Sequence, residues 1–364
     1  MKNNSLHTWI LAGSLIAIGT SCDPTPEPSS NEVEETDRTL FSQIDYAFSN
    51  TAKVWRGYEF SSFPQYYLAR ETENATPQRG FLVNPVNEVP GATRIPEENA
   101  QGLNVYRFDA EMKAANRKLK RGNGFYDYDY PINDGAYYVQ VYNQGEVERR
   151  GTSSIELAVH EVFHAFQNTW AYPENSMQDE KNYPITRDLL PLQLMEVEIA
   201  KKMPGEADLA AIDKYLSMYV AIRSRSIELD PTADQLVKNM ANNQELGEGT
   251  AKYVEYMVAK DLFATFDTSF EEVEVRAIDS KDGVRGYFAW GIWYGTGAAV
   301  TYMLKQKGVD VESKAKEGIN LYQMAVEALS LTAAQRADYL AQAKAEFGWD
   351  TILKTEADRL LALK

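Results

Sequence analysis

Two histidines and a glutamate form the pattern in this 364-residue chain that is best suited to catalysis. His160, Glu161 and His164 stand as His-Glu-x-x-His in the stretch VHEVFHAFQ. On a helix, two histidines at this spacing project from one face, one turn apart, so both imidazoles can bind the same ion. Glu161 lies about 100° around the helix from His160, where it can take a proton from a water on zinc. The pattern predicts a zinc site with His160 and His164 as ligands and Glu161 as general base.

The composition restricts the third zinc ligand. The chain has three histidines, and the third one, His7, lies in an N-terminal segment that we expect to be removed. The single cysteine, Cys22, stands at the predicted cleavage point. A catalytic zinc ion takes three protein ligands and keeps one position open. We therefore expect the third ligand to be Asp or Glu.

A second stretch, EGTAKYVE, begins at Glu248. It resembles the second zinc helix of gluzincins, in which the alanyl-aminopeptidase family carries Asn-Glu-Gly-Phe-Ala-x-Tyr-x-Glu. The resemblance implies that Glu248 is the third ligand, with Glu245 as the competing candidate. Gly249 and Ala251 are small, so we expect this helix to approach the His-Glu-x-x-His helix closely. Glu255 lies two turns further on, and we expect it to orient an imidazole.

A third stretch, YGTGAAVTYML, runs from Tyr294. It resembles the Tyr-x-Lys-Gly-Ala segment of the same family, with Thr296 where lysine is usual. The resemblance implies that Tyr294 donates a hydrogen bond to the tetrahedral intermediate, and Tyr287 is the alternative. A phenol near zinc is suited to this role because it can donate to a developing oxyanion.

The same family holds the free amino group of its substrate with the glutamate of Gly-x-Met-Glu-Asn on the substrate-binding strand. The corresponding segment here is Gly135-Ala136-Tyr137-Tyr138-Val139, which has no carboxylate. We expect this segment to be the edge strand on the substrate side, where a peptide can add through main-chain hydrogen bonds. The missing carboxylate favours an endopeptidase over an aminopeptidase.

The secondary structure expected to position these residues changes near residue 150, from mainly strands to mainly helices. Before it we expect a helix at 40–54 and strands at 64–69, 80–86, 104–108 and 136–143. The segment YDYDY, 126–130, is interpreted as an aromatic strand or turn edge rather than a carbohydrate site. After residue 150, apolar residues recur at helical spacing in 191–203, 207–229, 249–263 and 333–347.

Two local features complete the helical half. Ser153 and Glu156 have the capping-box spacing and predict a helix at 153–167. Helices through Met195 and Tyr219 are expected to cover the cleft. The prediction is an α+β fold, in which an N-terminal part (38–150) with a small mixed sheet packs on a mostly helical, zincin-like catalytic part (151–364).

The N-terminus predicts export and lipid anchoring. Residues 1–21 have a lysine near the start, an apolar core and small residues before Cys22, as in a bacterial lipoprotein signal peptide. An ordinary secretory signal is the alternative. Residues 22–37 are rich in proline, serine and acids, which predicts a flexible tether. We therefore expect a protein of the bacterial cell envelope, held to the membrane by lipid on Cys22.

The formal charge of −16 argues against a nucleic-acid partner, and the basic run 113–121 is interpreted as a solvated helix face. The expected function is zinc-dependent hydrolysis of peptide bonds in a peptide or protein substrate. The alternative is a surface binding lipoprotein that has a zincin fold without catalysis.

Overall fold

The computed structural model of the protein describes residues 33–149, 155–171, 178–202, 208–263, 269–271 and 273–364. The predicted signal peptide, Cys22 and the predicted tether before residue 33 lie outside the described residues, and so does Ser153. Within the described ranges, helices and one small mixed sheet form the α+β fold that the sequence predicted.

The described strands are β1 (Gln65–Ala69), β2 (Arg79–Val83), β3 (Thr93–Arg94), β4 (Val105–Arg107), β5 (Tyr126–Ile132) and β6 (Gly135–Tyr142). The described α-helices are α1 (Glu35–Val54), α2 (Met112–Arg121), α3 (Gln144–Glu148), α4 (Ile155–Gln167), α5 (Leu190–Lys201), α6 (Leu209–Glu228), α7 (Asn242–Gln244), α8 (Thr250–Ala259), α9 (Lys281–Gly286), α10 (Ile292–Gln306), α11 (Val311–Lys316), α12 (Leu321–Leu329), α13 (Ala333–Glu346) and α14 (Lys354–Leu363). A π-helical turn, η4 (Glu245–Gly249), leads directly into α8.

The six strands lie in the order β3-β4-β2-β1-β6-β5. β1 runs parallel to β6, and the other neighbouring pairs are antiparallel. The segment 135–139, expected as the edge strand, belongs to β6 and lies between β1 and β5, so that prediction was wrong. The edge strand on this side is β5, the YDYDY segment, because its hairpin with β6 adds it to the outside of the sheet; β3 forms the opposite edge.

Helices cover both faces of the sheet. On one face, α1 and α4 share a core with the strands; Phe41 of α1 meets Phe81 of β2 edge to face, with ring centroids 5.3 Å apart. On the other face, Leu119 of α2 packs with Leu82 and Val139. The basic residues of α2 point away from this core and are exposed, as predicted for a solvated face. Alternation along the central strands therefore supplies apolar side chains to two cores.

The predicted tether, residues 22–37, extends into residues that are helical in the structure. α1 begins at Glu35, five residues before the helix that the sequence predicted, because Glu34 and Asp37 form a capping box. Asp37 is fully buried, where it accepts hydrogen bonds from Arg79 (3.1 Å) and Tyr142 (2.6 Å). The acidic composition of the tether thus continues into a helix whose buried carboxylate has specific partners.

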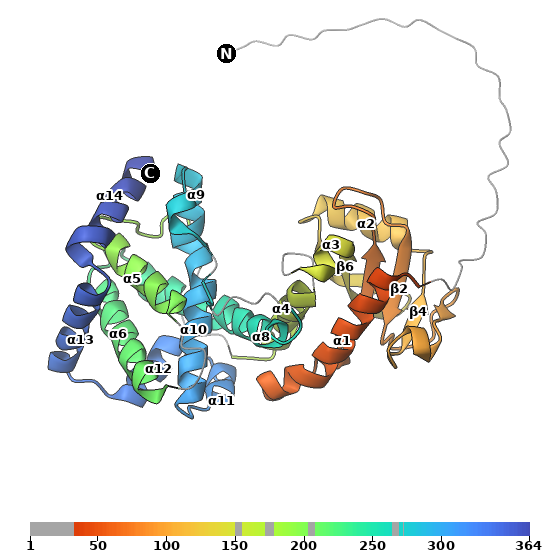
Figure 1. Cartoon of the computed structure of the whole chain (residues 1–364), viewed down its shortest axis with the longest axis horizontal. Coiled ribbons are helices and arrows are strands. Elements are labelled where there is room, and N and C mark those ends of the chain that lie inside the picture. Colours follow the sequence, from red (N-terminus) through yellow and green to blue (C-terminus); the bar gives the residue numbers. More distant parts are fainter. Residues whose placement is uncertain (1–32, 150–154, 172–177, 203–207, 264–268, 272) are drawn as a thin grey trace, which may run out of the picture.

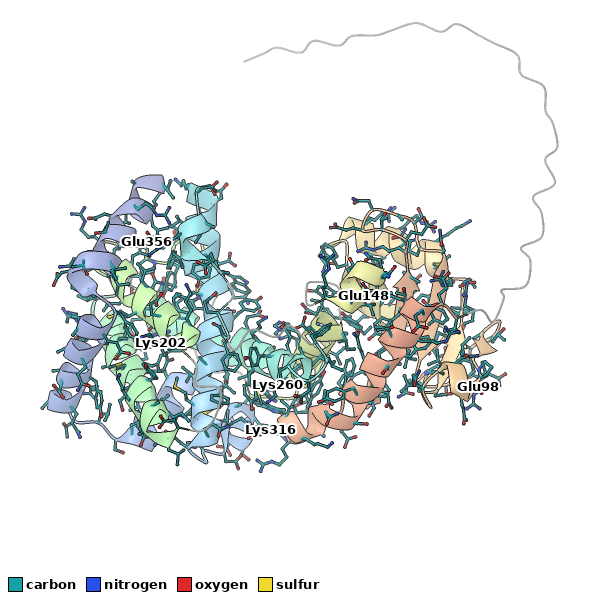
Figure 2. All side chains as sticks on the ribbon, in the orientation of Figure 1. Glu98, Glu148, Lys202, Lys260, Lys316 and Glu356 are labelled. Atoms are coloured by element: carbon teal, nitrogen blue, oxygen red, sulfur yellow. The ribbon has the colours of Figure 1, made fainter. Side chains whose placement is uncertain are left out.

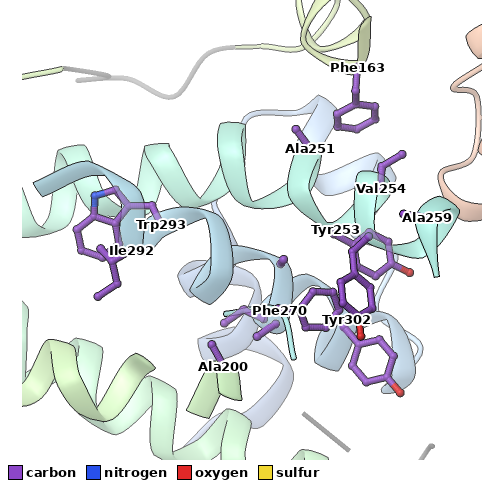
Figure 3. Packing of buried hydrophobic residues seen from close by; sticks show 14 of the residues in the cluster. Phe163, Ala200, Ala251, Tyr253, Val254, Ala259, Phe270, Ile292, Trp293 and Tyr302 are labelled. Carbon is purple, nitrogen blue, oxygen red and sulfur yellow. The ribbon is translucent and has the colours of Figure 1, made fainter. Parts of the chain in front are cut away.

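The C-terminal half forms a helical lobe around α10 (Figure 1). Its core is continuous with that of α4 and α8. Figure 3 shows Trp293 and Ile292 of α10 at one side of this buried cluster and the aromatic residues Tyr253, Phe270 and Tyr302 at the other. α5 packs against α6 and α10, and α6 against α12 and α13. The expectation that these two helices cover the cleft was therefore wrong, because they build the core of the helical lobe.

α4 and α8 pack side by side between the sheet and the helical lobe (Figure 1). Charged side chains cover the outside of both halves, for example Glu98 beside the sheet and Lys202 on the helical lobe (Figure 2). Among the described helices, none combines the length and the apolar character needed to cross a membrane.

Candidate metal centre

Three predicted ligands meet where α4 faces the π-helical turn η4. His160 and His164 lie one turn apart on α4, and Glu248 lies in η4. The separations are 3.1 Å between the two Nε2 atoms, 3.3 Å from His160 Nε2 to Glu248 Oε2 and 3.2 Å from His164 Nε2 to the same oxygen. The structure thus brings together residues that are 84 positions apart along the chain, as the predicted metal site requires.

These separations fit a small tetrahedral ion. Nitrogen and oxygen ligands lie about 2.0–2.2 Å from zinc, which places two tetrahedral ligands roughly 3.3–3.5 Å apart. The three measured separations fall within a few tenths of an ångström of this spacing. Two imidazoles and one carboxylate are also a donor set that catalytic zinc sites use.

The other ring nitrogen of His160 is held by a carboxylate. His160 Nδ1 lies 2.9 Å from Glu255 Oε2, and Lys252 Nζ donates to the other Glu255 oxygen at 2.7 Å. Burial opposes ionisation of Glu255, but the charge of Lys252 and the contact with His160 lower its pKa to about 2. An ionised Glu255 fixes the proton of His160 on Nδ1 and leaves Nε2 for the metal, the role that the sequence suggested.

His164 is oriented by Gln167, a residue that the sequence analysis missed. His164 Nδ1 lies 2.6 Å from Gln167 Oε1. The amide of Gln167 is oriented by its own donors, since Nε2 donates to the Gly247 carbonyl and to Thr250 Oγ1, both at 2.8 Å. Gln167 therefore ties α4 to η4 and α8 while it fixes the His164 ring. Its position three residues after His164, on the same face of the helix, was the available signal.

These contacts leave three acceptors facing one another. With a proton on each Nδ1, both Nε2 lone pairs point toward the Glu248 carboxylate. Either a proton or a metal cation at the centre of this group would relieve the repulsion between the acceptors. Burial lowers the pKa of His160, but hydrogen bonds to Glu248 and Glu255 outweigh burial and raise it to about 10. The contacts with His160 and His164 likewise outweigh burial and hold the pKa of Glu248 well below its usual range. The site favours positive charge, as a metal site must.

Glu245, the competing ligand candidate, has a different set of partners. It is fully buried and pairs with Arg223 at 2.8 Å. Tyr219 donates to it at 2.6 Å and Thr296 at 2.7 Å. Arg223 also pairs with Glu196 at 2.9 Å, so one guanidinium holds two carboxylates inside the helical lobe. Glu245 thus fixes η4 to the lobe, and Thr296, at the position where the family carries lysine, belongs to the same network.

Glycine residues allow close packing around Glu248, but the helix that packs there is α10 and not α4, as had been expected. A Cβ on Gly297 would lie 2.7 Å from both Gly249 Cα and the Glu245 carbonyl oxygen. Gly249 therefore allows α10, and not α4, to approach η4, which corrects the expectation for this residue. Ala251 does face α4, since Figure 3 shows it beneath the ring of Phe163.

Of the two candidate tyrosines, Tyr294 lies at the site. Its ring stacks on the His160 imidazole at 5.7 Å, with the planes 10° apart. Burial and then the nearby Glu248 carboxylate raise its pKa well above the usual value. Tyr287 is buried elsewhere, and after burial the group that most raises its pKa is Glu271. The structure therefore separates the two, with Tyr294 beside the three candidate ligands.

The edge strand β5 contributes a phenol that the sequence analysis did not assign to the site. The hydroxyl of Tyr128 donates to Glu161 Oε2. Tyr126 packs edge to face on Tyr128 at 5.4 Å, and burial followed by the charge of Glu161 raises its pKa to about 12. Glu161 lies on α4 and is buried, so its carboxylate points toward the sheet edge. Glu161, the predicted base, therefore faces the edge strand β5.

The correction of the edge strand also bears on the expected endopeptidase. The strand at the edge is not free of carboxylates, because β5 carries Asp127 and Asp129. Asp127 binds Lys118 at 2.7 Å. Asp129 lines a cavity of about 440 Å³ beside His164. Residues 135–139 lack a carboxylate, but Asp129 is a second position from which a carboxylate could reach a substrate's amino group.

Comparisons with protein-family models, with curated proteins and with solved structures found no match to this chain.

Proposed function

We propose that the protein is a zinc-dependent peptidase of the gluzincin type, with His160, His164 and Glu248 as zinc ligands. The observation that carries this proposal is the meeting of three ligand atoms within 4.8 Å, with both imidazoles oriented by Glu255 and Gln167. A bound zinc ion would supply Lewis acidity toward a carbonyl oxygen and would lower the pKa of a water. The other parts of the mechanism belong to side chains of this chain.

Glu161 acts as the base and then as the acid. It adjoins His160 on α4 and takes a proton from the attacking water, which it then passes to the leaving amine. Tyr294, stacked on the ring of His160, donates a hydrogen bond to the oxyanion that forms. Tyr128 donates to Glu161 and keeps its carboxylate turned toward β5. These residues come from four segments, α4, η4, α10 and β5, which explains why the site needs the whole fold.

The substrate in this proposal is a peptide or a protein segment in extended form. Edge strands present unpaired main-chain groups to which an extended chain can add. β5 is such an edge, and Tyr128 on it contacts the general base. We propose endopeptidase cleavage at the bacterial cell envelope, with the lipid on Cys22 as the membrane anchor.

The variant Glu161→Gln tests the proposal. Glutamine keeps the size of the side chain but cannot take a proton, so zinc content should stay at one per chain while cleavage of a peptide library is lost. Activity that persists in this variant would contradict the mechanism. Stoichiometric zinc in a wild-type protein that cleaves no peptide would instead favour the catalytically inactive binding lipoprotein.

A further inference from the structure

The cavity beside His164 has walls that are mostly apolar. Its apolar lining comes from three elements: Val162 and Ala165 of α4, Ala136 and Tyr138 of β6, and the Phe63-Pro64 segment before β1. Tyr128 lines it on the side of the edge strand. Its volume of about 440 Å³ is within the range of roughly 300–1,000 Å³ that ligand pockets occupy. Such walls suit a large apolar group.

The cavity lies where the metal centre meets solvent. The side chain of His164 is 23% exposed, whereas that of His160 is 6% exposed, and His164 is the ligand that lines the cavity. Tyr128 lines the same cavity and donates to Glu161. A group seated there is in contact with a metal ligand and with the partner of the general base.

A peptide that pairs with the edge strand β5 would place some of its side chains next to this cavity. Successive side chains of an extended peptide point to opposite faces of the sheet that it joins. The cavity lies on the face of the sheet that α4 covers, since Tyr138 and Val162 belong to the core shared by that face and that helix. Every second side chain of a peptide paired with β5 would therefore lie on the face of the sheet that holds the cavity, and the one opposite the bulge between Asp127 and Tyr130 would lie beside it.

The polar groups of the cavity determine which charged side chains it disfavours. Apart from His164, its polar residues are Asp129 and Asn168, and Asp129 is the one that carries charge. Asp129 lies on β5 and is exposed, which places its carboxylate at the rim. A negative rim repels an acidic side chain.

We propose that this cavity is a specificity subsite, which takes a large apolar side chain, preferably aromatic, from a residue that flanks the cleaved bond and which rejects Asp and Glu. The inference rests on the peptide hydrolysis proposed above.

A peptide library digested by the zinc-loaded protein and analysed by mass spectrometry tests this preference. One of the two positions that flank the cleaved bond should be enriched in Phe, Tyr and Leu and depleted of Asp and Glu. Blocked peptides that differ only at this position should give kcat/KM for Phe at least about 10-fold above that for Ala. Cleavage without any preference at both positions would overturn the subsite and leave the peptidase proposal standing.

Two variants link the preference to this cavity. Ala136→Trp fills it from β6 and should abolish the advantage of Phe over Ala, whereas Ala341→Trp, at an exposed alanine of α13, should keep it. Asp129→Lys should raise kcat/KM for the Glu peptide about 10-fold relative to the Phe peptide. Asp134→Lys, on the exposed turn between β5 and β6, is the matched control. Unchanged preferences in both cavity variants would contradict the assignment.

Binding separates this inference from the proposed function. Zinc-loaded Glu161→Gln should bind the blocked Phe peptide at least about 10-fold more tightly than the Glu peptide. This result, combined with a wild type that cleaves nothing, would support the subsite and overturn peptide hydrolysis. Equal binding of all peptides would overturn the subsite.

Discussion

Gly249 and Gly297 lie backbone to backbone, with Gly249 next to the predicted zinc ligand Glu248. A Cβ on Gly297 would lie 2.7 Å from Gly249 Cα, and this Cβ would meet backbone atoms, which cannot swing aside. The contact joins η4 to α10, so it sets the position of Glu248 relative to Tyr294. Close approach of two backbones is a place where glycine is required.

The variant Gly297→Ala should therefore damage both stability and the metal site. Overpacking of a tight contact costs about 1–3 kcal/mol, and the displaced η4 should bind zinc more weakly. Gly247→Ala is the matched control, because a Cβ there meets nothing within 4 Å although the residue lies in the same turn. Urea denaturation and zinc titration measure both effects. If the two variants behaved alike, the contact would not position the ligand.

Glu245 and Glu248 stand three residues apart and should respond differently to the same substitution. Glu248→Gln removes a proposed ligand, so stoichiometric zinc should be lost. Glu245→Gln leaves the three ligands in place but removes one of the two carboxylates that hold the buried Arg223. Breaking a buried ion pair costs about 3–5 kcal/mol, so this variant should unfold at lower urea concentration even when zinc is removed by a chelator. Loss of zinc in a folded Glu245→Gln protein would indicate that Glu245, and not Glu248, is the zinc ligand.

The sequence predicted the parts of this site that depend on local spacing. His160, Glu161 and His164 are set by one helix, and the α4 helix formed where the pattern required it. Glu248 was identified through a resemblance, and its distance to both histidines fits. The strand order could not be predicted from the sequence, because the periodicity of 126–142 predicts strands but does not indicate which one is outermost. Tyr128 and the Gly249–Gly297 contact were missed for the same reason, since both depend on how distant segments meet.

Removal of the side chains that orient the imidazoles should weaken metal binding without abolishing it. Gln167→Ala releases His164 Nδ1, and Glu255→Gln removes the charge that faces His160 Nδ1. Loss of such partners typically lowers metal affinity about 10–100-fold. Gln144→Ala, at an exposed glutamine of α3, is the control. Competition with a chromogenic chelator gives the zinc affinities, and an affinity equal to that of the wild type in both variants would argue against this orienting role.

Tyr294→Phe should lower kcat while KM stays nearly constant. The substitution keeps the ring that stacks on His160 and removes only the hydroxyl. Loss of one donor to an oxyanion costs about 10²–10³-fold in kcat. Tyr287→Phe, which changes a buried phenol near Glu271, should leave kcat unchanged. Steady-state kinetics on one peptide distinguishes the two, and equal losses would assign the effect to packing.

The choice between endopeptidase and aminopeptidase depends on what Asp129 does at the rim of the cavity. An endopeptidase needs no contact with the amino terminus of its substrate, so an acetylated peptide should be cleaved as fast as the free one and at an internal bond. A carboxylate that holds a substrate ammonium group would reverse this result, because acetylation removes the positive charge and with it the ion pair.

Asp129→Asn is the discriminating variant: it should leave both peptides equally good substrates if the enzyme is an endopeptidase. If cleavage instead released the first residue, required a free amino group and fell at least about 10-fold in Asp129→Asn, Asp129 would be the amino-group anchor and the protein an aminopeptidase. Asp127→Asn serves as control, since that carboxylate pairs with Lys118 and should not affect the comparison.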